Sequence, residues 1–140
     1  MKANVTVSVN SEIIYAQDIR ESISQSAQGV RELLGSLLRI SYISEEKDFS
    51  YKTDIILFAG DNSRVRVRRT GDIRSDMLFE NGREHIFEYA ASGLCLEASV
   101  ITHALSVNNA DGLIKIDVEY TLKIGGEAQR SRLCYVIKEL

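Results

Sequence analysis

A dense group of arginines stands out in the segment RVRVRRTG, residues 64–71. Arg64, Arg66 and Arg68 alternate with valines, and Arg69 follows directly before a Thr-Gly pair. Guanidinium groups bind phosphates and carboxylates through a planar fork of donors, so the group first suggests a nucleic-acid or anion site. Alternate residues of a β-strand share one face, however, and the same pattern therefore also fits the solvent-exposed side of a strand.

The overall composition argues against nucleic acid as a partner. The chain has 140 residues, of which 44% are hydrophobic and 26% charged, and its formal net charge is -3. Length and composition predict one domain, residues 1–140, with a substantial core. Nucleic-acid modules normally carry a basic excess, which this chain lacks. No apolar run approaches the ~20 residues of a membrane helix, and the N-terminal segment has no apolar stretch typical of a signal peptide. We therefore expect a cytoplasmic protein without a membrane partner.

Alternation with a period of two dominates the chain. In the segment LIKIDVEYTLKI, residues 113–124, Ile114, Ile116, Val118 and Tyr120 share one face, and polar residues occupy the other. This is the pattern of a strand with one buried and one solvated face. Similar runs recur between turn-forming pairs such as Gly-Asp, Asn-Gly and Gly-Gly. The sequence therefore predicts an all-β fold, either a sandwich or a barrel.

The hairpin around Gly125-Gly126 has a coherent register. A two-residue loop, which suits a type I′ turn, places Val118 opposite Leu133 and Ile116 opposite Tyr135. Apolar side chains then meet across the pair on one face, as a correct register requires.

The arginine segment is predicted to enter a three-residue loop, Arg69-Thr70-Gly71, with glycine in the left-handed conformation. In this register Val67 lies opposite Ile73, and Arg68 lies opposite Asp72. The alternating arginines then form a solvated outer wall with acidic neighbours, of which Asp76 and Glu88 are also examples. Such exposed pairs contribute only about 0.2–1 kcal/mol each.

A second three-residue loop is predicted at Glu80-Asn81-Gly82. It places Met77 opposite His85, and it brings His85 to the inner face of the fold.

Residues 30–42 leave two alternatives open. Their leucines fit helical spacing, whereas the same stretch also fits a hairpin around Gly35-Ser36. A glycine inside a helix costs about 1 kcal/mol, which does not decide between the two.

Short motifs spread over most of the chain carry a family resemblance. They are Gly29, ISYISEE at 40–46, RTG at 69–71, MLFENG at 77–82, Tyr89, Gly93 followed by LCLE, Thr102, and GLIKIDVEYTLKIGGE at 112–127. In order and spacing they resemble the uncharacterised bacterial YwiB-like family, a domain of unknown function. The resemblance implies a single antiparallel meander β-barrel of about 8–10 strands, calycin-like or lipocalin-like. It also implies the hairpin over residues 30–42, but no established activity.

A barrel of this size is either filled by its own side chains or holds one small ligand. The predicted inward set is rich in large residues, namely Ile40, Tyr42, Val65, Val67, Met77, Phe79, Phe87, Tyr89, Ile116, Tyr120 and Tyr135. A filled core and a small apolar or carboxylated ligand in the barrel or at its mouth both stay open. For a ligand site we predict Arg69, Tyr42, His85, Tyr89 and Tyr120.

Arg69 is the sharpest candidate among these residues. Its planar fork suits a carboxylate at one end of the barrel. In the alternative interpretation, Arg69 is a turn arginine that bonds carbonyl groups or neighbouring carboxylates, such as Glu45 and Glu46.

The rival hypothesis is a protein-interaction or assembly domain that uses the charged outer wall, with Arg64, Arg66, Arg68 and Arg74 as its surface. The sequence is also compatible with a homodimer, in which Ile101 and Leu105 on the outer face would find cover.

Enzymatic activity is the least favoured hypothesis, with His85 as a general base. No Gly-rich phosphate loop, nucleophile elbow or paired-carboxylate motif is present, and no catalytic residue, metal or cofactor is predicted. Cys95 and Cys134 are expected on strands two apart, at about 10 Å, too far for a disulfide, so we expect reduced thiols.

Overall fold

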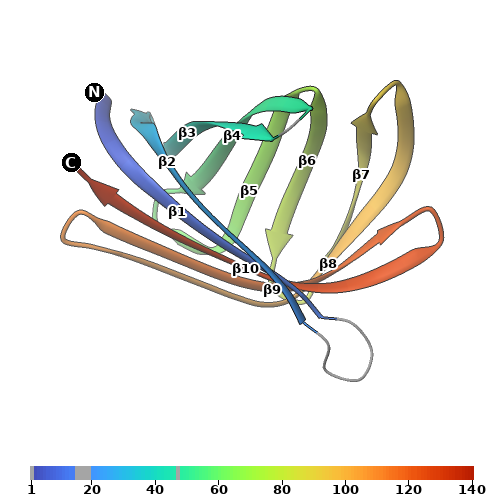
Figure 1. Cartoon of the computed structure of the whole chain (residues 1–140). Coiled ribbons are helices and arrows are strands. Elements are labelled where there is room, and N and C mark those ends of the chain that lie inside the picture. Colours follow the sequence, from blue (N-terminus) through green and yellow to red (C-terminus); the bar gives the residue numbers. More distant parts are fainter. Residues whose placement is uncertain (1, 15–19, 47) are drawn as a thin grey trace.

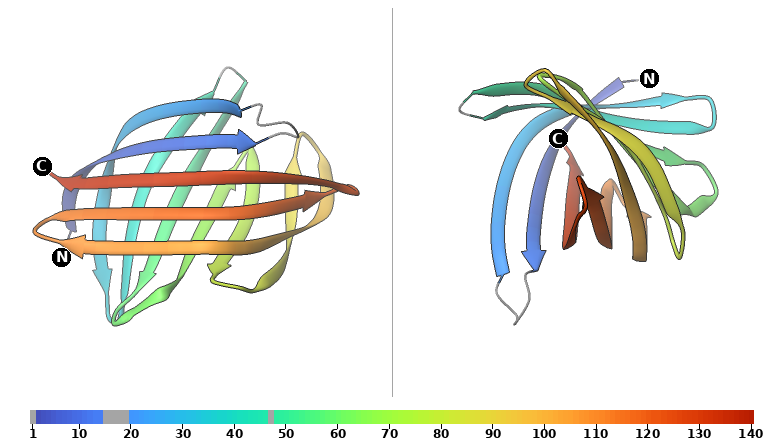
Figure 2. Two further views of the ribbon diagram at one scale, coloured as in Figure 1. Left: turned by 90° about the horizontal axis from the view of Figure 1, so that it is seen from below. Right: turned by 90° about the vertical axis from the view of Figure 1, so that its right-hand side faces the viewer.

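Ten antiparallel strands form one closed barrel. The computed structural model describes residues 2–14, 20–46 and 48–140, without the side chains of Arg20 and Glu46. The strands are β1 (Lys2–Ile14), β2 (Arg20–Leu34), β3 (Leu37–Glu46), β4 (Phe49–Phe58), β5 (Asp61–Gly71), β6 (Ile73–Glu80), β7 (Glu84–Ala91), β8 (Leu94–Ala110), β9 (Leu113–Ile124) and β10 (Glu127–Glu139). Each strand pairs with the next, and β10 returns to β1, so the predicted meander barrel is confirmed (Figures 1 and 2). The described residues include no helix with the length and apolar character needed to span a membrane.

The segments with alternating sequence form strands, each of which has one face packed in the barrel core. In β9, Ile114, Ile116 and Val118 are at most 3% exposed, whereas Lys115 between them is exposed. The predicted pairs Val118–Leu133 and Ile116–Tyr135 are both present between β9 and β10. Alternation therefore placed both the strand and its register correctly.

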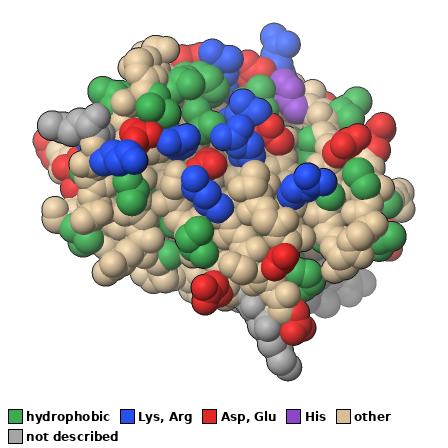
Figure 3. Space-filling model, turned by 90° about the horizontal axis from the view of Figure 1, so that it is seen from above, with side chains coloured by type: hydrophobic (Ala, Val, Ile, Leu, Met, Phe, Trp, Pro, Cys, Tyr) green, Lys and Arg blue, Asp and Glu red, His purple; other side chains and the backbone are tan. Residues whose placement is uncertain are grey.

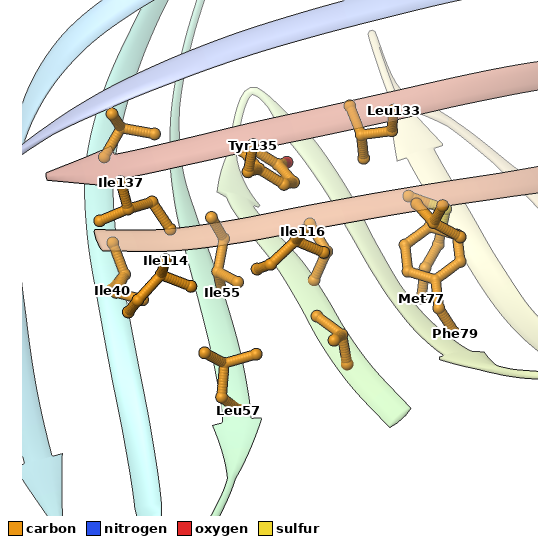
Figure 4. Close-up of a cluster of buried hydrophobic side chains, with 14 of the residues drawn as sticks. Ile40, Ile55, Leu57, Met77, Phe79, Ile114, Ile116, Leu133, Tyr135 and Ile137 are labelled. Carbon is orange, nitrogen blue, oxygen red and sulfur yellow. The ribbon is translucent and has the colours of Figure 1, made fainter. Parts of the chain in front are cut away.

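The inner faces meet in a continuous hydrophobic core. Side chains from β3, β4, β6, β9 and β10 converge there (Figure 4). Each fully buried aliphatic or aromatic side chain contributes about 1.5–3 kcal/mol relative to its exposed state. All of the predicted inward residues belong to this core or pack against it. Tyr135 lies among them with its hydroxyl inside the barrel (Figure 4).

Residues 30–42 form a hairpin, as the family resemblance implied. Leu34 pairs with Leu37 across a turn in which Gly35 has a positive φ of 61°. The ladder extends to Gly29 and Tyr42. A β-carbon on Gly29 would lie only 2.6 Å from the Ser41 carbonyl oxygen, so glycine permits this close approach of β2 and β3.

The predicted loop at residues 69–71 is wrong. Val67 pairs with Met77 rather than with Ile73, and Arg68 pairs with Asp76 rather than with Asp72. The cause lies in β4, because β5 continues alongside it as far as Gly71 instead of turning. The register error is an even number of residues, so the predicted inner and outer faces are nonetheless correct.

The end of β5 is held to β4 by reciprocal hydrogen bonds. The Asp72 amide donates to the Ser50 carbonyl at 3.1 Å, and the Ser50 amide donates to the Asp72 carboxylate at 2.8 Å. Gly71 has a φ of 128°, and a β-carbon there would lie 2.8 Å from the Ser50 carbonyl oxygen. Only glycine fits this junction without displacing backbone.

The predicted register of β6 and β7 is also wrong. These strands pair only at Ile73–Ala91 and Arg74–Ala90, and His85 pairs with Val100 of β8 rather than with Met77. Beyond the two pairs, β6 bonds to β5 and β7 bonds to β8, but they form no ladder with each other. We call this unpaired stretch between β6 and β7 the seam.

The turn that closes the seam is anchored to β8. The Arg83 amide donates to the Glu80 carbonyl at 2.9 Å, and the Gly82 amide donates to the Thr102 carbonyl at 2.9 Å. The Thr102 amide in turn donates to the Arg83 carbonyl at 3.1 Å. The turn after β6 is thus held by β8, at the end where β6 and β7 form no ladder.

A β-bulge in β8 corrects a further prediction. The register shifts between Thr102 and Ala104, so His103 is the extra residue. A bulge exchanges the faces of the residues that follow it. Leu105, predicted on the outer face as dimer surface, therefore packs against the core. His103 is exposed, with Nε2 2.6 Å from the Thr121 hydroxyl.

Replacement of Gly71 tests the β4–β5 junction. We expect Gly71→Ala to lower the free energy of unfolding by about 1–3 kcal/mol more than Gly82→Ala, because only the former forces a β-carbon onto backbone. Gly82 is a matched control, with a φ of 76°, and a β-carbon there would meet no atom within 4 Å. Urea denaturation of both variants measures the difference, and equal losses would contradict the close approach.

Candidate functional site

The outer arginines are paired with carboxylates. On the face seen in Figure 3, Lys and Arg side chains gather with acidic ones beside them. Arg66 binds Asp76 through two hydrogen bonds, one of them at 2.7 Å from Nε to Oδ1. Arg68 lies 3.7 Å from a carboxylate oxygen of Asp54. The prediction of a solvated wall with acidic neighbours is confirmed, but the individual partners differ from those expected.

Arg64 and Arg74 complete the predicted interaction surface. Arg64 donates to Asp61 at 3.0 Å, and its guanidinium carbon lies 4.0 Å from the centre of the Phe58 ring. Arg74 is exposed and forms no ion pair within the described part of the chain. Exposed pairs of this kind are worth about 0.2–1 kcal/mol each, so the wall contributes little to stability.

Arg69 lies inside the barrel, not in a turn. It belongs to β5, opposite Thr53 of β4 and Ser75 of β6. Strand alternation places it on the same face as Val65 and Val67, which are each 1% exposed. The expectation that Arg69 occupies a tight loop is therefore wrong, and the guanidinium projects into the interior.

Tyrosines surround this guanidinium. The Arg69 guanidinium carbon lies 5.7 Å from the centre of the Tyr51 ring. Tyr42, Tyr120 and Tyr135 are the other hydroxyl groups close enough to act on its charge. Tyr42 and Tyr135 contact each other edge to face, with ring centres 6.5 Å apart. We call Arg69 and these four tyrosines the interior cluster.

Arg69 has no carboxylate partner among the described side chains. Its Nε is buried and makes no hydrogen bond there, whereas the residue as a whole is only partly buried. Burial lowers the pKa of the guanidinium, and the tyrosine hydroxyls, Tyr135 foremost, outweigh that effect and raise it. Burial raises the pKa of the Tyr120 and Tyr135 hydroxyls, so at neutral pH these two groups are uncharged and do not neutralise the cation. The interior cluster thus holds a net positive charge.

Further polar atoms around the cluster lack partners. Thr53 Oγ1, Ser75 Oγ and the Tyr135 hydroxyl are buried and make no hydrogen bond in the described chain. Arg69 and Tyr42 influence the pKa of Tyr135, but neither is placed with the distance and angle of a hydrogen bond. A buried polar group without a partner costs about 1–3 kcal/mol. Donors and acceptors concentrated around one cation are typical of a binding site.

A cleft at the seam leads from the surface to Arg69. Its volume is about 490 Å³. It is lined by Arg68, Arg69, Thr70, Arg74, Ser75, Asp76, Ile86, Phe87, Glu88, Ala90 and Cys95. Arg69 and Ser75, which carry two of the buried atoms without partners, thus belong to the lining of this cleft.

A second hollow, of about 370 Å³, lies over β2 and β3. Its charged residues satisfy one another, since Glu32 binds Arg39 at 2.6 Å and Lys2 at 3.4 Å. The seam cleft is the stronger candidate because its cation and its buried hydroxyl have no such partners in the described chain.

The interior cluster brings together three of the five predicted ligand residues, Arg69, Tyr42 and Tyr120. His85 is not part of it, because its Nε2 lies 3.2 Å from a Glu80 carboxylate oxygen. Tyr89 pairs with Leu96 of β8 and packs against the core, and it is not among the tyrosines that act on the Arg69 charge.

The predicted carboxylate partners of Arg69 are not observed beside it. Glu45 is exposed on β3, and the side chain of Glu46 lies outside the described residues. The sequence patterns did not identify Tyr51, Thr53 and Ser75 as members of the site. The alternation Tyr51, Thr53, Ile55 within β4 was the available signal, since all three share the inner face.

Fold and site together define a ten-stranded antiparallel barrel with a polar, cationic cluster in an otherwise apolar interior. Residues 7–134 match the family described as domain of unknown function (DUF1934), and the chain belongs to that family. The crystal structure of the YwiB protein from Bacillus subtilis is similar, with a TM-score of 0.86 and 19% sequence identity over 99% of this chain and 93% of that one. The resemblance seen in the sequence motifs is thereby confirmed, and at this identity the structural likeness shows the fold alone. No curated protein matches the sequence.

Removal of the interior charge is expected to stabilise the fold. In Arg69→Met the aliphatic stem remains, and the unpaired cation is lost, so the free energy of unfolding should rise by about 1–2 kcal/mol. Arg66→Met, which breaks an exposed ion pair with Asp76, should lower it by up to about 1 kcal/mol. Chemical denaturation at pH 7 distinguishes the two. A clear loss of stability in Arg69→Met would show that the arginine has a structural role.

Alkaline stability reports on the burial of Tyr135. Burial raises the pKa of this hydroxyl well above its ordinary value. The unfolded chain therefore releases this proton near pH 10 while the folded chain retains it, and stability falls as pH rises further. The slope is about 1.4 kcal/mol per pH unit for each such group. In Tyr135→Phe this contribution to the pH dependence should vanish, with little loss of stability at pH 7. Denaturation curves at pH 7 and above pH 10 measure the effect. If the variant lost as much stability between these pH values as wild type does, the prediction would be wrong.

Proposed function

We propose that the protein binds a small molecule through a carboxylate group, and that Arg69 is the residue that binds this carboxylate. The observation that carries the proposal is the arginine inside the barrel, with a buried Nε that has no partner among the described residues. A charge in such a position is costly unless it is paired. Arg69 therefore has the features of a functional cation rather than of a stabilising one.

A carboxylate fits the donors at this position. The guanidinium presents a planar fork that matches the two oxygens of a carboxylate. Ser75 lines the cleft, and its buried Oγ, which has no partner in the described chain, can donate a further hydrogen bond. Uncharged hydroxyl groups and one cation together suit a single negative charge.

The barrel architecture supports the same proposal. Barrels of eight strands are just wide enough to hold one small ligand, and the diameter grows with the number of strands. Ten strands leave room for a polar cluster beside a packed apolar core. The calycin-like comparison and the cytoplasmic location expected from the sequence are parts of this proposal.

The alternative of an interaction surface on the outer wall has less support. Arg64, Arg66 and Arg68 each face a carboxylate of the same chain, so of the four arginines of this surface Arg74 alone has no ion pair within the described residues.

Titration with benzoate tests the proposal. We expect saturable binding by calorimetry in wild type and a loss of about 10- to 100-fold in affinity in Arg69→Gln, because a hydrogen bond to a charged group is worth about 1.5–3 kcal/mol. Arg66→Gln, which removes a charge from the outer wall, is the matched control and should bind as wild type does. If both variants bind as wild type does, or if wild type binds neither benzoate nor an organic acid retained from its native host, the proposal fails.

A further inference from the structure

We propose that the ligand is a monocarboxylate with an apolar body, which lies in the seam cleft with its carboxylate on Arg69 and its apolar part against β7. This inference rests on the proposed function and goes further by naming the class of ligand and its place. Its basis is the lining of the cleft, to which β5 contributes Arg68 and Arg69, whereas β7 contributes Ile86, Phe87 and Ala90 beside a single charged residue, Glu88.

The charged residues around the cleft favour a ligand that carries a single negative charge. Of its three arginines, Arg68 already faces Asp54 at 3.7 Å, and Arg74 is exposed, so that solvent and salt screen its charge. Arg69 is the buried one without a partner in the described chain. Two carboxylates, Asp76 and Glu88, also line the cleft and would repel a second anionic group. A dicarboxylate or a phosphate dianion is therefore disfavoured.

The β7 side of the cleft offers apolar surface to the rest of the molecule. Ile86 is 71% exposed, the highest fraction among the large hydrophobic residues that line the cleft. Ala90 lies on the same face of β7 as Ile86, and Phe87, from the inner face, also lines the cleft. Next to the paired Arg74 and Ala90, β7 has no ladder with β6, and the side chains of both strands line the cleft there. A volume of about 490 Å³ falls within the range of small-molecule sites.

Buried Ser75 supplies the second, independent indication. The residue is 5% exposed, its Oγ has no partner in the described chain, and it lines the cleft next to Arg69 in the pairing of β5 with β6. An oxygen of the carboxylate would accept a hydrogen bond from this hydroxyl. The carboxylate of the ligand would thus contact a cation and a neutral donor, and its apolar part would contact apolar side chains.

A series of straight-chain carboxylates tests the inference with the full-length protein. We expect affinity to rise from acetate through butanoate and hexanoate to octanoate, by about two- to fourfold per methylene, because each buried methylene adds to binding. Succinate, with two charges, should bind at least tenfold more weakly than hexanoate. Ile86→Thr should flatten the rise, whereas Ile43→Thr, at another exposed position on a strand, should leave it unchanged.

The outcomes separate the inference from the proposed function. If all carboxylates bind equally and depend on Arg69, a carboxylate site exists but the apolar class is wrong. If the rise with chain length persists in Ile86→Thr, the apolar part lies elsewhere and the cleft assignment is wrong. If no carboxylate in the series binds, both the inference and the proposed function fail.

Discussion

The inward position of Arg69 is the constraint on which the site depends. The β4–β5 ladder runs without a register shift from Val65 to Gly71, so strand alternation fixes every side chain between them. Val65 and Val67 face the core, and Arg69 must therefore face it as well. Gly71 holds the end of this ladder against β4 at a distance that no other residue permits. The strand geometry thus places the charged side chain of Arg69 in the interior. Tyrosines surround it there and solvate the charge without neutralising it.

The seam makes this charge accessible. A complete β6–β7 ladder would close the wall beside Arg69, but the turn after β6 bonds to Thr102 of β8, and the two strands pair at two positions only. The incomplete pairing leaves backbone groups of β6 and β7 outside the ladder. It also leaves a cleft that is lined by Ser75 and Arg69. An interior cation and an incomplete wall in the same place are difficult to explain by stability alone.

The sequence predicted the faces of the strands far better than their pairing. Period-two alternation identified the all-β class, the inward set and the register around Gly125-Gly126, because a one-residue error there would have exposed the whole apolar face. It failed at residues 69–71, where bonds between Asp72 and Ser50, distant in sequence, extend β5 past the expected loop. It failed again at β6 and β7, where Thr102 determines the turn. Both register errors were shifts by an even number of residues, so the candidate ligand residues kept their faces although their neighbours changed. Leu105 did change face, because the bulge at His103 precedes it.

The arginine-rich segment therefore contains two different kinds of residue. Arg64, Arg66 and Arg68 are outer and paired, whereas Arg69, one position out of phase, is inner and unpaired among the described residues. NMR observation of the Nε–H groups during addition of octanoate distinguishes them. The Arg69 resonance should shift strongly and its exchange with water should slow, while the Arg66 resonance stays in place. An Arg69 resonance that is already protected from exchange and does not respond to carboxylate would contradict a ligand-binding role for the interior cation.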